Sequence, residues 1–146
     1  MSKRICLFAA MIAGVLCSPA LAQQGGDPGG RISDMMGNIR QANRHAHSGF
    51  VIDYQCNSTC TMKLGAAHVC ITTRAAFGFH AAHVRPDPRS AVDPDSTRTM
   101  ASYYPPGILA WVIRNNALAT TDFIYMDANT AHSLGIPWCP RNVGNW

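Results

Sequence analysis

The chain has 146 residues, of which 47% are hydrophobic and 14% charged, a balance typical of one folded domain and not of a disordered tail or a coiled coil. All eight acidic residues are Asp, so the chain has no Glu and glutamate-dependent chemistries such as the HExxH zinc proteases are excluded. The formal net charge of +4 is small and scattered, which argues against a nucleic-acid partner.

The first 22 residues have the three parts of a signal peptide. Lys3 and Arg4 precede an apolar run from Ile5 to Cys17, and Ala20-Leu21-Ala22 forms a cleavage site. The alternative is a membrane anchor, but an anchor needs about 20 apolar residues and this run is shorter. We therefore expect residues 1–22 to be a signal peptide and residues 23–146 to be one domain, periplasmic or secreted, with no stable membrane anchor.

Four cysteines follow the predicted cleavage site: Cys56, Cys60, Cys70 and Cys139. In an oxidising compartment an even number of cysteines predicts disulfides, and four cysteines allow three connectivities. The alternative is a zinc site that uses Cys56 and Cys60 with Cys70 or Cys139. Export favours the two disulfides, and we expect no metal and no cofactor.

The first half of this domain is predicted to alternate helices and strands. Apolar residues spaced by three and four predict a helix from Ile32 through about Arg44, and β-branched and aromatic residues predict a strand over Phe50–Tyr54. A tight turn at Cys56–Cys60, a short helix over Thr61–Leu64 and a strand over Val69–Thr72 are predicted next. A short apolar run from Ala75 to His80 completes this half.

In the second half, three prolines and three Asp between Arg85 and Asp95 predict a surface loop. The next helix is expected to begin near Thr97 or Thr99, to be interrupted at Pro105-Pro106 and to resume over Ile108–Ile113. A strand over Phe123–Met126, an N-cap at Asp127 and a helix over Ala128–Leu134 that ends at Gly135 follow. The alternation predicts an α/β domain with some parallel strand pairing.

Three features suited to acyl transfer fall at predicted turns or strand ends. Ser58 lies in a strand-to-helix turn, where its hydroxyl is presented outward and the backbone N–H of Thr59 can face an oxyanion. His80 ends the next apolar run and can accept the Ser58 proton, while Gly29 and Gly30 offer backbone N–H groups to the oxyanion. The alternatives are a structural serine between two cysteines and a hydrogen-bonded core histidine. His83, with His45 and His47, also admits a metal site, which the absence of further ligands at suitable spacing disfavours.

The order of these residues resembles the Clp-protease and crotonase superfamily. Pro28-Gly29-Gly30 precedes a helix, a strand and the serine turn, and Gly78-Phe79-His80 follows a second strand. Ser58 follows Gly30 by 28 residues and His80 follows Ser58 by 22, close to the spacing of that family. The chain is similar as well to a group of short exported bacterial proteins, on the segments Asp27–Ile32, Cys56–Thr61, Cys70–Thr72 and Gly78–Ala82, with Tyr104-Pro105, Trp111 and Leu134-Gly135.

The resemblance implies a small ClpP/crotonase-like α/β domain with Ser58 as nucleophile, His80 as base and Gly29 and Gly30 as oxyanion donors. It also implies self-association, since the family packs into rings or trimers. The sequence departs from the family in two places. Trp138 occupies the position of the family's catalytic acid, for which Asp122 or Asp127 are candidate substitutes. The strand that the family has before Pro28 would fall inside the signal peptide.

Two functions therefore remain open. The first is an exported serine hydrolase, peptidase- or esterase-like, that acts through an acyl-enzyme on a substrate the sequence does not identify. The second is a catalytically degenerate ClpP-like binding or structural module of the cell envelope that keeps the fold and the disulfides. The missing acid and the missing strand favour the second function, and the spacing of Gly30, Ser58 and His80 favours the first.

Overall fold

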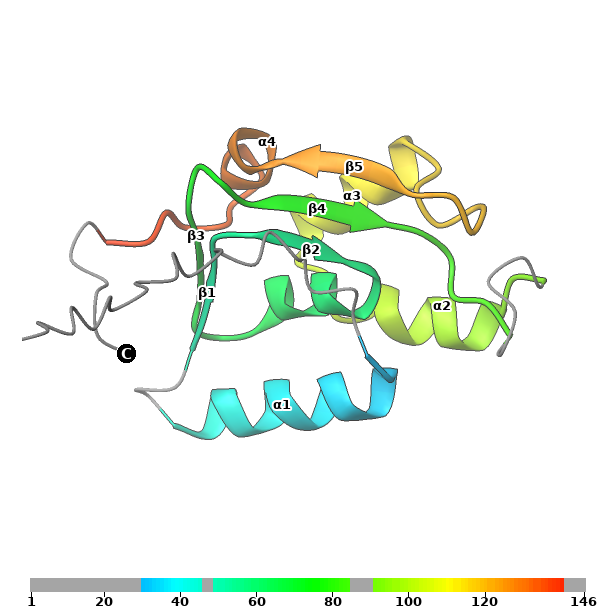
Figure 1. Cartoon of the computed structure of the whole chain (residues 1–146), viewed down its shortest axis with the longest axis horizontal. Coiled ribbons are helices and arrows are strands. Elements are labelled where there is room, and N and C mark those ends of the chain that lie inside the picture. The colour runs from blue at the N-terminus through cyan, green and yellow to red at the C-terminus, as the bar shows by residue number, and fades with distance from the viewer. Residues whose placement is uncertain (1–29, 46–48, 85–90, 141–146) are drawn as a thin grey trace, which may run out of the picture.

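A computed structural model describes residues 30–45, 49–84 and 91–140 (Figure 1). The predicted signal peptide, Gly29 and His47 lie outside these residues, as does most of the predicted loop between Arg85 and Asp95. The chain is a mixed α/β domain, as the sequence predicted. Its elements are α1 (Ile32–Arg44), β1 (Phe50–Ile52), β2 (Gln55–Asn57), the 3₁₀ helix η1 (Ser58–Gly65), β3 (Val69–Ile71), β4 (Ala76–Phe79), α2 (Pro94–Ala101), α3 (Pro106–Arg114), β5 (Ile124–Asp127) and α4 (Ala128–Ser133).

The strands form two small sheets. In the first, β1 pairs in parallel with β3, and in the second, β4 lies between β2, which is parallel to it, and β5, which is antiparallel. The single strand predicted over Phe50–Tyr54 is therefore only half right. The chain leaves one sheet after Ile52 and enters the other at Gln55, so β1 and β2 have different partners.

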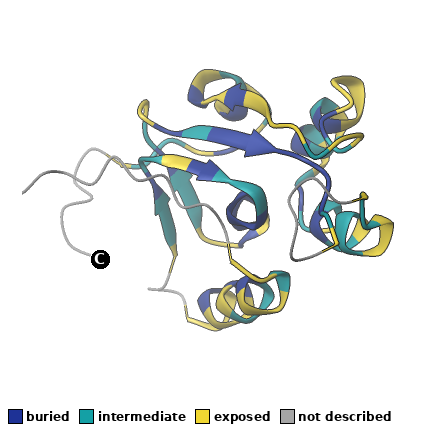
Figure 2. Cartoon of the chain, turned by 45° about the vertical axis from the view of Figure 1, so that its right-hand side comes forward, coloured by how far each residue is buried: buried dark blue, intermediate teal, exposed yellow. Residues whose placement is uncertain are grey.

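The core has two parts. The larger part packs the inner faces of the strands against η1, α3 and α4, and its largest side chains include Phe77, Phe79 and Ile108, all fully buried. The smaller part joins Met35 and Ile39 of α1 to η1 and α2 (Figure 2). The spacing of three and four that predicted α1 is thus the spacing of its buried face.

The helix predicted to begin near Thr97 or Thr99 begins earlier, at Pro94. Asp93 is its N-cap, and its Oδ1 accepts hydrogen bonds from the N–H groups of Asp95 and Ser96 at 3.1 Å. Proline suits the first helical position because its missing N–H would have no partner there. The predicted interruption is confirmed, since α2 ends before Pro105 and α3 begins at Pro106.

The four cysteines form two disulfides, as predicted, and the structure selects one of the three connectivities. Cys56 pairs with Cys60, and Cys70 pairs with Cys139. The zinc alternative built on these cysteines is therefore wrong. Two disulfides are compatible with an extracellular or periplasmic protein. Among the described residues, no helix combines the length and the apolar character that crossing a membrane requires.

Candidate active site

Parallel pairing of β2 with β4 brings Ser58 and His80 to one edge of the sheet. Asn57, the last residue of β2, is the register partner of Gly78, and Ser58 and His80 follow directly after the two strand ends. The carboxyl ends of parallel strands meet at the same edge, which is the usual place for a site in an α/β sheet. Gly78 permits the close approach, because a Cβ there would lie 2.4 Å from Asn57 Oδ1.

Ser58 has a backbone conformation that serine seldom adopts. Its φ of +56° lies in the left-handed region, and it is the first residue of η1. Such strain persists only where the surrounding structure holds it, and here the Cys56–Cys60 disulfide closes the turn on both sides of the serine. A strained serine between a strand and a helix is the geometry that presents a nucleophilic hydroxyl.

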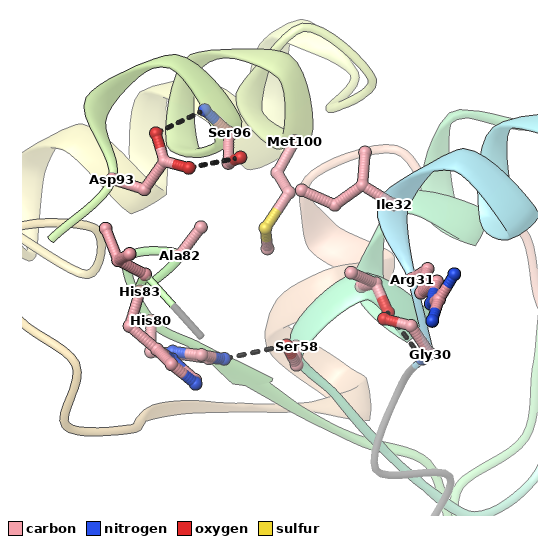
Figure 3. A pocket seen from close by; sticks show the side chains of 12 residues that line it. Gly30, Arg31, Ile32, Ser58, His80, Ala82, His83, Asp93, Ser96 and Met100 are labelled. Carbon is pink, nitrogen blue, oxygen red and sulfur yellow. Dashed lines mark hydrogen bonds between the residues drawn. The ribbon is translucent and has the colours of Figure 1, made fainter. Parts of the chain in front are cut away.

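The Ser58 hydroxyl is hydrogen-bonded to the imidazole of His80. The distance from Ser58 Oγ to His80 Nε2 is 2.7 Å, and Figure 3 shows the two side chains pointing toward each other. The His80 side chain is buried, and Phe123 packs edge-on against its ring. Burial lowers the pKa of His80 below the ordinary 6.5; the backbone of Ala81 opposes this effect and neighbouring His83 adds to it. The imidazole is therefore neutral at pH 7 and can accept the serine proton.

The other ring nitrogen of His80 is the incomplete part of the site. Nδ1 is buried and has no hydrogen-bond partner among the described residues. Asp127 caps α4 through Thr130 N–H at 2.7 Å and pairs with Ala76, at the opposite end of β4 from His80. Asp122 is exposed in the turn before β5. Neither Asp is bonded to His80.

Trp138 stands where the resemblance described above would place a catalytic acid, and it lies away from His80. It bridges Ile71 of β3, stacks on His132 and lines a second cavity that shares no residue with the cavity at Ser58. An acid at position 138 would therefore not reach His80 in this fold.

The predicted oxyanion donors have different surroundings. Gly29 is outside the described residues. The N–H of Gly30 is donated to Thr59 Oγ1 at 2.8 Å, and the Thr59 hydroxyl is donated back to the Gly30 carbonyl at 3.0 Å. In this arrangement the Gly30 N–H is engaged. Thr59 lies in the first turn of η1, where backbone N–H groups have no partner within the helix, so its N–H is the donor best placed for an oxyanion.

A cavity of about 300 Å³ opens beside Ser58 and His80. Ile32, Ala82, Val84 and Met100 give it apolar walls, and Arg31, His83, Asp93 and Ser96 give it polar ones (Figure 3). The sequence reasoning did not find the contribution of α2 or of Phe123. The N-cap at Asp93 could have shown where α2 begins, but no local pattern shows that α2 faces Ser58.

The described residues contain no group of three or more His, Cys or Asp side chains that could hold a metal ion. Comparison with known proteins found no matching family model, no matching curated protein and no matching solved structure.

Proposed function

We propose that the protein is an exported serine hydrolase, peptidase- or esterase-like, in which Ser58 and His80 act through an acyl-enzyme. The observation that carries the proposal is the 2.7 Å hydrogen bond between Ser58 Oγ and Nε2 of the buried His80. A structural serine in a turn has no need of a left-handed backbone or of an imidazole partner. The imidazole partner is what activates a nucleophilic serine, and the strained turn is a conformation in which such a serine is presented.

In this mechanism His80 Nε2 takes the Ser58 proton as Oγ attacks the carbonyl carbon of an ester or amide. The developing oxyanion faces the N–H of Thr59. When the tetrahedral intermediate collapses, the leaving group departs with the proton from Nε2, and water then releases the acyl group by the same steps in reverse. The cavity beside Ser58 receives the acyl part of the substrate, and its apolar walls favour an apolar group of modest size.

A shortened ClpP/crotonase-like fold, anticipated from the motifs, belongs to this proposal. It is supported by the parallel β2–β4 pair with the serine and the histidine at its carboxyl edge. Self-association belongs to it as well, and the exposed apolar side chains at edge strand β5 support it: Phe123, Ile124 and Tyr125. Export is supported by the two disulfides.

The second candidate is a degenerate module that keeps the fold without turnover. One observation favours it: Nδ1 of His80 has no hydrogen-bond partner in the part of the chain that the structure describes. Loss of the group that fixes the histidine tautomer costs a serine hydrolase about 10⁴-fold in rate. The two candidates make opposite predictions about the reactivity of Ser58.

A fluorophosphonate probe separates them, because it phosphonylates only an activated serine. The hydrolase predicts labelling of the native protein that disappears in Ser58→Ala and in His80→Ala. Ser133→Ala is the matched control, since Ser133 is an exposed helix serine bonded to a backbone carbonyl. Absence of labelling in protein shown to be folded by circular dichroism would favour the degenerate module.

A further inference from the structure

Two buried imidazole nitrogens next to the site have no hydrogen-bond partner among the described residues. They are His80 Nδ1 and His83 Nδ1. Buried polar atoms are nearly always hydrogen-bonded in folded proteins, so two unpaired buried nitrogen atoms at one site need an explanation. The two nitrogen atoms belong to neighbouring rings (Figure 3), whose centroids are 5.9 Å apart and whose planes are inclined by 34°.

The two rings are neighbours, and their centroid separation is the observation that connects them. Two hydrogen-bonded imidazoles have centroids about 5 Å apart, so joining the two Nδ1 atoms from the 5.9 Å seen here requires a movement of the His83 side chain. Catalytic hydrogen bonds are often long before substrate binds and shorten in the complex. His83 has freedom for this movement because it is only partly buried, whereas His80 is held by Ser58 and Phe123.

We propose that His83 occupies the role of the missing carboxylate, so that the site is a Ser58–His80–His83 relay. The Nδ1–H of His80 is donated to the unprotonated Nδ1 of His83, whose own proton is on Nε2. This bond fixes the tautomer in which His80 Nε2 is free to accept the Ser58 proton. His83 is a positioning residue, since it acts through His80, and the inference rests on the proposed function.

The other polar groups around the two rings are less suitable. Asp93, on the α2 side of the cavity, is engaged by the Ser96 hydroxyl at 2.7 Å and by two backbone N–H groups. Arg31, on the α1 side, has only donors, and the Nδ1–H of His80 needs an acceptor. In the turn before β5, it is Phe123 and not Asp122 that packs on His80. Among these side chains, His83 is the one whose acceptor nitrogen is buried and has no partner among the described residues.

The proton balance differs from that of a carboxylate triad. His83 stays neutral throughout, so it orients His80 but adds no negative charge when His80 becomes imidazolium. In this respect His83 assists less than a carboxylate, which would also stabilise the imidazolium charge.

The pairing itself is tested by nuclear magnetic resonance of ¹⁵N-histidine-labelled native protein. The proposal predicts that His80 carries its proton on Nδ1 and His83 on Nε2, with a scalar coupling between the two Nδ1 atoms. A proton on His80 Nε2, or a His80 spectrum that does not change in His83→Leu, would overturn the pairing. This measurement needs no activity, so it decides the pairing even if Ser58 proves unreactive and the proposed function fails.

The catalytic role is tested by the rate of fluorophosphonate labelling in two variants. His83→Leu removes the acceptor and should lower the labelling rate about 100-fold, whereas His83→Asn, whose Oδ1 lies near the position of Nδ1, should stay within about 10-fold of the native rate. His68→Leu, at an exposed histidine, is the control and should be unchanged. Equal rates in His83→Leu and His83→Asn variants that are both folded would contradict the role.

Discussion

Asn57 and Gly78 are register partners in the parallel pair β2–β4, and this pairing is what places Ser58 beside His80. The contact is tight, because a Cβ on Gly78 would lie 2.4 Å from Asn57 Oδ1 and 3.0 Å from the rings of Phe123 and Tyr125. The reactive pair therefore depends on a glycine that takes no part in the chemistry.

Gly78→Ala should separate the two strand ends and lengthen the bond between Ser58 and His80. We expect a labelling rate at least about 100-fold lower, as a misplacement of 1 Å can cause, and a loss of about 1–3 kcal/mol in the free energy of unfolding from overpacking. Gly37→Ala is the control, since nothing lies within 4 Å of a Cβ there. Chemical denaturation and labelling kinetics measure the two effects, and native kinetics in folded Gly78→Ala would show that the register does not control the site.

The pH dependence of labelling should reflect the burial of His80. Since burial lowers its pKa, the imidazole stays neutral below pH 6.5, and the labelling rate should hold its plateau to a pH below that value. The same shift affects stability: as pH falls below 6.5, the unfolded chain binds a proton at His80 before the native protein does, so the free energy of unfolding decreases. A labelling profile with its inflection above 6.5 would contradict this account. In His80→Ala, the part of this pH-dependent decrease in unfolding free energy that comes from His80 should disappear.

The two disulfides should have separable roles. Cys70–Cys139 joins residues 69 apart in sequence, and Cys56–Cys60 joins residues only 4 apart. By chain entropy, loss of the long link in Cys70→Ser/Cys139→Ser should cost about 4 kcal/mol of unfolding free energy, and loss of the short link in Cys56→Ser/Cys60→Ser about 2 kcal/mol. The labelling rate should respond in the reverse order: loss of the short link should lower it more than loss of the long link, because the short link holds Ser58 in its strained conformation. Denaturant titration and labelling of both double variants make the comparison, and a short-link variant with native reactivity would refute the holding role.

Trp138→Asp should fail to create a catalytic acid. Position 138 lies on Ile71 and His132, at a cavity separate from the one beside Ser58. We expect no gain in labelling rate and a loss of stability, since Trp138 is packed against the main core. Faster labelling in Trp138→Asp would show that the chain brings this position to His80 after all.

Much of the fold follows from local pattern. The helix α1, the break between α2 and α3, and the Asp127 cap of α4 were predictable because spacing, proline and capping residues act within a few residues of one another. The division of Phe50–Tyr54 between two sheets was not predictable, because it depends on which distant strand each half pairs with.

For the site, the spacing of Ser58 and His80 allowed the pair to be predicted as a hypothesis, and the structure places the two side chains in contact. The motif that puts Trp138 at an acid position carries no information on where this C-terminal segment packs, and the structure places Trp138 beside Ile71 and His132. Two details depend on side-chain placement, which no sequence pattern specifies. One is the hydrogen bond from Gly30 N–H to Thr59 Oγ1, and the other is the lack of a partner for His83 Nδ1 among the described residues.

The most direct test of the account is peptide mapping by mass spectrometry after reaction of the native, disulfide-bonded protein with a fluorophosphonate. The account predicts one adduct per chain, on Ser58, formed at a rate that requires His80. An adduct on another serine, or no adduct on folded protein in which both disulfides are intact, would contradict it.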